Sequence, residues 1–184
     1  IDLVSFTGGT STGSKVAEVA APQFKKLSLE LGGKNSSIVL DDCDMDSTIK
    51  GVVRSGFMNQ GQVCLCGSRV LVQEGVYDEF LRRFIEEVES MRIGDPSDEK
   101  TDLGALISAD HLRKVERYIE LAKEEGGTIL TGGYPHLPEK FSNGNWIAPT
   151  VISGLGVDSR CSTEEIFGPV VSIHRFSDDS EAIQ

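Results

Sequence analysis

The sequence predicts an α/β fold, because short apolar runs alternate with amphipathic helical stretches along most of its 184 residues. The clearest helical stretch is 76–91, where Phe80, Phe84 and Val88 fall on one stripe at helical spacing. The clearest strand is 25–31, where leucines alternate with polar side chains, the pattern of a half-buried strand.

Turn and cap residues delimit the expected elements. Strands are expected at 2–6, 25–31, 36–40, 69–73, 128–131 and 170–176, and helices at 12–21, 44–59, 76–91 and 111–125. Pro22 ends the first helix, and Asp44 or Asp46 can cap the second. Gly126 and its neighbouring glycine close the last helix, and a Gly/Pro/Asn-rich loop is expected over 132–145.

Composition excludes some classes of protein. The net charge is −11, whereas nucleic-acid-binding proteins usually present clustered Lys and Arg. No apolar run approaches the roughly 18 residues that span a bilayer, and there is no signal peptide, so a cytoplasmic location is expected. IDLVSF at the start already resembles a strand and SDDSEAIQ at the end resembles an unfinished helix, so we expect an excerpt of a longer protein.

FTGGTSTGSK, residues 6–15, is a Gly-rich turn between a strand and a helix, where backbone N–H groups can bind a phosphate. A Walker loop requires Gly-Lys-Ser/Thr, but Gly13 is followed by Ser14, and Lys15 comes one position late. The dinucleotide fingerprint requires glycine at its third position, where Thr10 stands. From these residues, a phosphate site and an ordinary Gly-rich turn both stay open.

LELGGK, residues 29–34, places Glu30 on the polar side of an expected strand, beside two glycines. A partly desolvated carboxylate has a raised pKa and can act as a general base. The alternative is a Glu on the solvent face of a half-buried strand.

FMNQGQVCLCGSR, residues 57–69, holds Cys64 and Cys66 one residue apart. A zinc site needs about four ligands, and the histidines are scattered far away, so no metal is expected. A redox dithiol more often has Cys-x-x-Cys spacing. A single nucleophilic thiol fits better, because the small polar residues before it expose backbone N–H groups that lower a thiol pKa and hold an oxyanion. Cys43 and Cys161 are expected to be buried packing residues.

TEEIFGPVV, residues 163–171, pairs two acids with an aromatic residue and Gly-Pro. Its spacing alone predicts a turn that enters a strand.

In order, five segments resemble motifs of the aldehyde dehydrogenase superfamily. FTGG with Gly13 resembles the family's FTGS-x-x-x-G turn, LELGGKN (29–35) its glutamate motif and NQGQVCLCGSR (59–69) its active-site cysteine motif. NWIAPTV (145–151) and EEIFGPV (164–170) follow at family-like places. The resemblance implies an open, mostly parallel sheet flanked by helices: a catalytic domain over 33–184, incomplete at its C-terminus, preceded by the tail of a Rossmann-like cofactor domain over 1–32.

The resemblance also implies roles for individual residues. Cys64 aligns with the nucleophile and Glu30 with the general base, and no metal is implied. The implied contacts with NAD, or NADP, are phosphates at Gly8, Gly9 and Gly13, the nicotinamide amide at the Leu31 carbonyl, and the nicotinamide ribose at Glu165, with Phe167 packing nearby. Gly9 stands where the family commonly has Ser, which removes one hydroxyl donor to phosphate and leaves the backbone donors.

The implied activity is the NAD(P)+-dependent oxidation of an aldehyde to a carboxylic acid through a thiohemiacetal and a thioester on Cys64. NQGQVCLC and KKLSLELGGKN are most similar to the branch that acts on 2-aminomuconic and hydroxymuconic semialdehydes, in which Leu follows the nucleophile as Leu65 does. A homodimer or homotetramer is implied, with upstream and downstream regions completing the cofactor site, the oxyanion hole and the oligomer. The alternatives are a non-catalytic homologue and a P-loop nucleotide-binding protein, which the displaced Lys15 disfavours.

Overall fold

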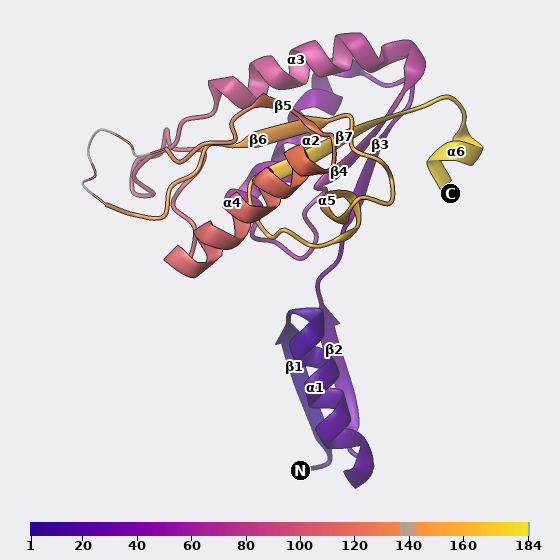
Figure 1. Cartoon of the computed structure of the whole chain (residues 1–184), viewed down its shortest axis with the longest axis vertical. Coiled ribbons are helices and arrows are strands. Elements are labelled where there is room, and N and C mark those ends of the chain that lie inside the picture. Colours follow the sequence, from indigo (N-terminus) through magenta and orange to yellow (C-terminus); the bar gives the residue numbers. More distant parts are fainter. Residues whose placement is uncertain (137, 139–140, 142, 184) are drawn as a thin grey trace. The chain divides into compact units, whose positions relative to one another are not determined.

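The fold was analysed in a computed structural model that describes residues 1–136, 138, 141 and 143–183. The chain forms two compact units, Ile1–Gly33 and Lys34–Gln184, and each is described by itself (Figure 1). Within the described ranges, no helix is long and apolar enough to cross a membrane.

The first unit is a single β-α-β element. Strand β1 (Leu3–Gly8) pairs in parallel with β2 (Lys26–Leu31), and helix α1 (Thr10–Ala20) connects them, followed by a 3-10 turn, η1 (Ala21–Gln23). Helix α1 ends where Pro22 begins to interrupt the helical hydrogen bonds, as the sequence predicts. Burial alternates along β2, so the strand is half-buried as expected.

The second unit is built on a five-stranded sheet in the order β3-β4-β7-β6-β5. Its strands are β3 (Ser36–Val39), β4 (Arg69–Gln73), β5 (Thr128–Thr131), β6 (Thr150–Ser153) and β7 (Val170–Phe176). Every pairing in it is parallel except that of β5 with β6. The predicted open, mostly parallel sheet of an α/β fold is therefore confirmed.

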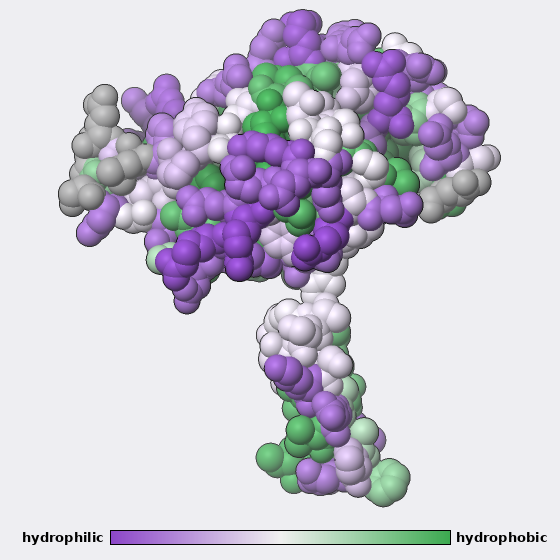
Figure 2. All heavy atoms as spheres, in the orientation of Figure 1, coloured by the Kyte–Doolittle hydropathy of each residue, from purple (hydrophilic) through white to green (hydrophobic). Residues whose placement is uncertain are grey.

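Helices cover both faces of this sheet. Helices α2 (Met45–Phe57) and α3 (Tyr77–Ser90) share one apolar cluster with the sheet, which includes Phe57, Phe80 and Phe84. Helix α4 (Ala109–Glu124) contributes to a second cluster. Val171 belongs to the first cluster and Val170 to the second, and neighbouring residues of a strand point to opposite faces. Figure 1 shows α3 and α4 on different sides of the strands, and Figure 2 shows a hydrophilic surface where α4 meets solvent.

Several bounds differ from those predicted. Helix α2 ends at Phe57 because the next residues leave helical geometry, and α4 begins at Ala109 because the Ser108 side chain caps it. Strand β6 and the short helix α5 (Arg160–Thr163) were not predicted, and α6 (Asp179–Ile183) fits the expected helix start. Parts of the predicted 132–145 loop (137, 139–140 and 142) and Gln184 lie outside the described residues.

Candidate active site

The segments of the second unit that carry Cys64, Glu165 and Phe167 meet at one end of its sheet. Asn35 precedes β3, the turn with Cys64 precedes β4, and the segment ending in Pro169 precedes β7. These three strands are parallel neighbours, so the residues before them lie at the same end of the sheet. The topology thus gathers stretches that lie up to about 130 residues apart in the sequence.

The turn before Cys64 has an unusual backbone. After α2 the chain forms a 3-10 turn, η2 (Met58–Gly61), in which Asn59, Gln60 and Gly61 have φ angles of 52°, 57° and 66°. This is the left-handed region, which costs a residue with a side chain roughly 1–2 kcal/mol. Two successive residues with side chains hold it here, so the surrounding contacts must stabilise the turn.

Side-chain amides supply part of that stabilisation. Asn59 donates a hydrogen bond to the carbonyl of Gln62 over 3.0 Å. The Gln62 side-chain oxygen accepts from the backbone N–H of Ile107 at 3.1 Å. The Gln60 amide, with its oxygen toward Gly104, accepts from that residue's N–H at 2.8 Å. The polar stretch that the sequence singled out is therefore a network that fixes the turn.

Gly61 is fixed by a close approach as well as by its φ angle. A Cβ atom at this position would lie 2.2 Å from the carbonyl oxygen of Gly168. Real Cβ atoms essentially never come closer than 3.0 Å to such an atom. Glycine lets the two backbones touch, and this contact joins the cysteine turn to the EIFGP stretch.

Asn35 closes the same loop from the other side. Its side-chain Nδ2 donates to the carbonyl of Cys64 over 2.8 Å, and its own carbonyl accepts from the N–H of Arg69 at 3.2 Å. Both ends of the 64–69 stretch are thereby bound to one residue. The Cys64 side chain stays exposed on this immobilised backbone.

The structure separates the two cysteines. The thiol of Cys66 is buried and donates to the carbonyl of Gly56 over 3.1 Å. Burial raises the pKa of Cys66 to about 11, so this thiol stays protonated near neutral pH. Cys161 is also buried, as predicted, and burial raises its pKa to about 12. Cys43 is partly buried against the core. Only Cys64 among the four is exposed.

Lys34 has a buried ammonium group that interacts electrostatically with Cys66, Cys161 and Glu165. Its Nζ has no hydrogen-bond partner within the described part of the chain. Burial lowers the pKa of Lys34 to about 8, an effect that the nearby Cys161, Cys66 and Glu165 oppose. Lys34 is thus a cation at neutral pH that loses its proton more readily than a surface lysine.

Glu165 and Phe167 lie on the stretch that leads into β7. Phe167 has a φ angle of 62°, again left-handed. The His111 ring donates from Nε2 to the Phe167 carbonyl over 2.5 Å, and the Lys114 Nζ donates to the Glu165 carbonyl over 3.1 Å. Helix α4 therefore holds this stretch, and Gly61 abuts it just beyond Phe167.

The remaining candidates lie in the first unit. Gly9 is the N-cap of α1, and a Cβ atom there would meet nothing within 4 Å. A Cβ atom on Gly13 would lie 2.5 Å from Leu31, so this glycine lets α1 pack closely on β2. Gly8 pairs with Leu31 at the ends of the two strands, and Glu30 is exposed on β2. Five candidates thus share the first unit, and Cys64, Glu165 and Phe167 share the second.

No cluster of three or more His, Cys, Asp or Glu side chains that would hold a metal ion occurs among the residues placed in the structure.

Comparisons with known proteins identify the family. The model of the aldehyde dehydrogenase family matches residues 1–184. The chain belongs to the aldehyde dehydrogenase family. It is 45% identical to 2-aminomuconic semialdehyde dehydrogenase of Mus musculus and 44% identical to 2-hydroxymuconic semialdehyde dehydrogenase of Pseudomonas putida, covering 100% of this chain and 38% of each relative. The chain thus spans about 38% of the length of these curated relatives.

Solved structures of the family agree with this fold. The crystal structure of betaine aldehyde dehydrogenase from Staphylococcus aureus in complex with NAD+ superimposes with a TM-score of 0.97 at 40% identity, covering 100% of this chain and 37% of that one. The predicted membership of the aldehyde dehydrogenase family, and the predicted likeness to its muconic semialdehyde branch, are confirmed.

Several residues of this aldehyde dehydrogenase site were not singled out from the sequence. Asn35 ends the LELGGKN motif, and its place directly before β3 was the signal available. His111 and Lys114 had no such signal, because their contacts join residues 56 and 51 positions apart.

Proposed function

We propose that the protein containing this chain oxidises an aldehyde to a carboxylic acid with NAD+, or NADP+, as the hydride acceptor. The observation that carries the proposal is the exposed Cys64 thiol on a backbone held by Asn35, two residues before a cysteine whose thiol is buried. A nucleophile must be both accessible and positioned, and Cys64 meets both conditions. The family membership and the names of the relatives support the same reaction.

The residues of the chain suggest how the reaction proceeds. The Cys64 thiolate adds to the aldehyde carbon and forms a C–S bond, and the carbonyl oxygen becomes an oxyanion. The Cys64 backbone N–H holds that oxyanion, together with a side-chain amide from the upstream region that completes the oxyanion hole. Glu30 then takes a proton from a water molecule whose oxygen attacks the thioester carbonyl, which releases the carboxylic acid and restores the thiolate.

The family resemblance assigns the cofactor contacts residue by residue. The turn at Gly8 and Gly9 leads into the N-terminus of α1, where free N–H groups favour phosphate, and the open space at Gly9 leaves room for it. The Leu31 carbonyl and the Glu165 carboxylate would hold the nicotinamide amide and its ribose, beside Phe167. When bound, NAD+ supplies the two-electron acceptor that takes a hydride from the thiohemiacetal and leaves a thioester.

The same reasoning extends to substrate and organisation. A muconic semialdehyde is the proposed substrate, because relatives named for such substrates share 42–47% identity with the chain.

The proposed domain assignment is a cofactor-domain tail over 1–32 and a catalytic domain over 33–184. A homodimer or homotetramer is proposed from the family resemblance. The four free cysteines support a reducing compartment such as the cytoplasm.

The test uses the full-length protein and aldehyde-dependent formation of NADH. Cys64→Ala and Cys64→Ser should lose essentially all turnover, whereas Cys43→Ser, a cysteine remote from the site, should keep it. Glu30→Gln should still release one equivalent of NADH in a burst and then stall, because hydride transfer precedes hydrolysis. Normal turnover in the Cys64 variants would refute the nucleophile, and a wild-type protein without NADH formation would indicate a non-catalytic homologue.

A further inference from the structure

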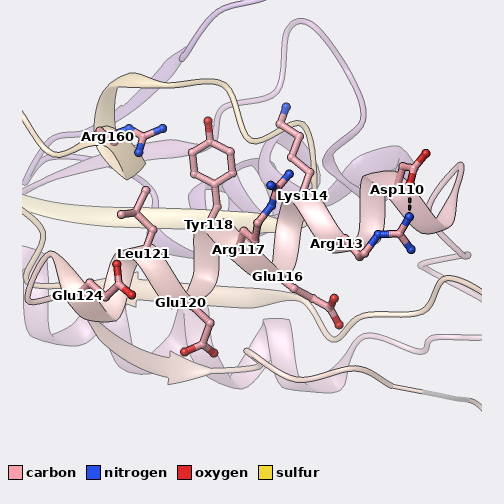
Figure 3. A pocket seen from close by; sticks show the side chains of 10 residues that line it. All are labelled: Asp110, Arg113, Lys114, Glu116, Arg117, Tyr118, Glu120, Leu121, Glu124 and Arg160. Carbon is pink, nitrogen blue, oxygen red and sulfur yellow. Dashed lines mark hydrogen bonds and ion pairs between the residues drawn. The ribbon is translucent and has the colours of Figure 1, made fainter.

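Helix α4 contacts the stretch that contains Glu165 at regular intervals. The stretch, residues 160–167, runs along one side of α4. It also contacts Glu125, the residue directly after the end of the helix. The contacts join Glu125 to the N–H groups of Arg160 and Cys161 (2.9 and 3.2 Å), Tyr118 to Cys161 and Glu164, Lys114 to the Glu165 carbonyl, and His111 to the Phe167 carbonyl. The helix positions differ by three, four and seven residues, which places them on one face. Figure 3 shows Tyr118 and Lys114 pointing to one side of α4, and Glu116 and Glu120 to the other.

Tyr118 lies at the centre of these contacts and binds the stretch twice. Its hydroxyl donates to Glu164 Oε2 over 2.6 Å, and its backbone carbonyl accepts from the Cys161 thiol at 3.3 Å. Arg160 donates to both carboxylate oxygens of Glu164, at 2.8 and 3.1 Å. The Glu164 side chain therefore accepts three hydrogen bonds, one from Tyr118 on α4 and two from Arg160 on α5.

The charge states favour this arrangement across the physiological range. Hydrogen bonds from Arg160 and then from Tyr118 lower the pKa of Glu164 to about 2, so its carboxylate stays ionised. Burial, and then the bond to Glu164, raise the pKa of Tyr118 to about 12, so its hydroxyl keeps the proton that it donates. A neutral donor on an ionised acceptor is a charge-assisted hydrogen bond, which is stronger than a neutral one.

The geometry of Glu164 transmits this constraint to the next residue. Glu164 has extended backbone, with φ −95° and ψ 146°. Tyr118 holds the side chain of Glu164, and Lys114 holds the carbonyl of Glu165, so the backbone is fixed on both sides of the Glu165 Cα atom. A fixed Cα atom restricts the directions that the Glu165 side chain can take.

We propose that Tyr118 is a positioning residue for Glu165: by holding Glu164, it sets the direction in which the Glu165 carboxylate meets the ribose hydroxyls of the cofactor. The proposal rests on the proposed function, because it requires that Glu165 bind the cofactor. Tyr118 would touch neither substrate nor cofactor. It would act through its hydrogen-bond partner Glu164, which precedes Glu165 in the sequence.

The experiment measures the binding of NAD+ to the full-length enzyme. Tyr118→Phe removes the hydroxyl alone, Glu164→Gln removes the charge, and the double variant tests whether the two act together. Tyr134→Phe and Glu120→Gln are matched controls, because both residues are exposed and neither side chain is hydrogen-bonded to the described 160–167 stretch. Dissociation constants come from titration with NAD+, and KM for each substrate and kcat come from steady-state rates.

We expect Tyr118→Phe to raise the dissociation constant and KM for NAD+ by about five- to ten-fold, with kcat at saturating NAD+ and KM for the aldehyde changed less than about two-fold. The double variant should be no weaker than Glu164→Gln alone, since Tyr118 acts through Glu164. A general loss of structure would lower kcat and the melting temperature without this selectivity.

Two negative results are distinguishable. If the wild type and the controls bind NAD+ and Tyr118→Phe binds it equally well, or if the effects of the two single variants add, the positioning role is wrong and the proposed function stands. If the wild type does not bind NAD+ at all, the proposed function fails and this inference fails with it.

Discussion

Asn35 and Cys64 are joined by a hydrogen bond of 2.8 Å from the Asn35 side-chain Nδ2 to the Cys64 carbonyl. In the sequence, Asn35 comes five residues after Glu30, the proposed base, and four residues after the end of β2. Tying the carbonyl of Cys64 fixes the orientation of the following peptide unit and restricts that of Cys64 itself. A fixed backbone is what an oxyanion-holding N–H requires.

Asn35→Asp should therefore impair the cysteine. The carboxylate cannot donate to the Cys64 carbonyl and places a negative charge beside it, so we expect kcat to fall by about ten-fold or more. The rate of Cys64 alkylation by iodoacetamide should fall in the same variant, because a nearby negative charge disfavours the reactive thiolate form. Asn143→Asp, an exposed residue outside the site, serves as the control. Wild-type kinetics in Asn35→Asp would show that the bond is incidental.

Gly61→Ala should be strongly destabilising. The new Cβ atom would lie 2.2 Å from the Gly168 carbonyl oxygen, at a φ of 66°. Gly126→Ala is the matched control, because Gly126 has a φ of 87° and open space around it. Gly126→Ala should cost about 1 kcal/mol of unfolding free energy through its backbone alone, and Gly61→Ala about 3 kcal/mol or more through the added clash. Urea denaturation of the full-length protein measures both, and equal losses would contradict the close approach.

Much of the fold was predictable from the sequence. The bounds of β4, β5 and β7 match the prediction, because each is an apolar or β-branched run between turn residues. Strand β6 was missed because its first three residues are buried, so it shows no alternation. Helix α5 was missed because four polar or small residues carry no helical period.

The site was only partly predictable, for a different reason. Motif resemblance singled out Cys64 and Glu165, which are local features of their segments. The residues that hold those segments, such as Tyr118, do so through contacts 46 positions away in sequence. Only the tertiary structure reveals such partners, because periodicity describes neighbours along the chain.

Alkylation should distinguish the cysteines in the order of their exposure. Cys64 is exposed, whereas Cys66 is buried with a pKa of about 11, so only about one Cys66 thiol in a thousand is ionised at pH 8. Brief treatment of the native full-length protein with iodoacetamide, followed by peptide mapping, should label Cys64 first and Cys66 only after denaturation. Cys161, with a pKa of about 12, is the internal control for a buried thiol. Preferential labelling of Cys66 would exchange the two assignments.

His174 should make stability depend on pH. It lies buried on β7, within 3.2 Å of the Ser172 hydroxyl and 3.4 Å of the Ser162 hydroxyl. Burial, followed by the charges of Arg69 and Lys34, lowers its pKa. As pH falls through about 6.5, the unfolded chain takes up a proton that the folded chain resists, so the unfolded state gains stability, by at most about 1.4 kcal/mol per pH unit.

His174→Val removes this proton uptake. Its unfolding free energy should therefore fall less between pH 7.5 and pH 5.5 than that of the wild type, because the difference isolates one histidine from the carboxylates that titrate in the same range. His136→Asn, on the loop beside Trp146, should keep the wild-type dependence. Urea denaturation of the full-length proteins at the two pH values gives the comparison. Parallel curves for wild type and His174→Val would mean that the folded protein binds the proton as readily as the unfolded chain.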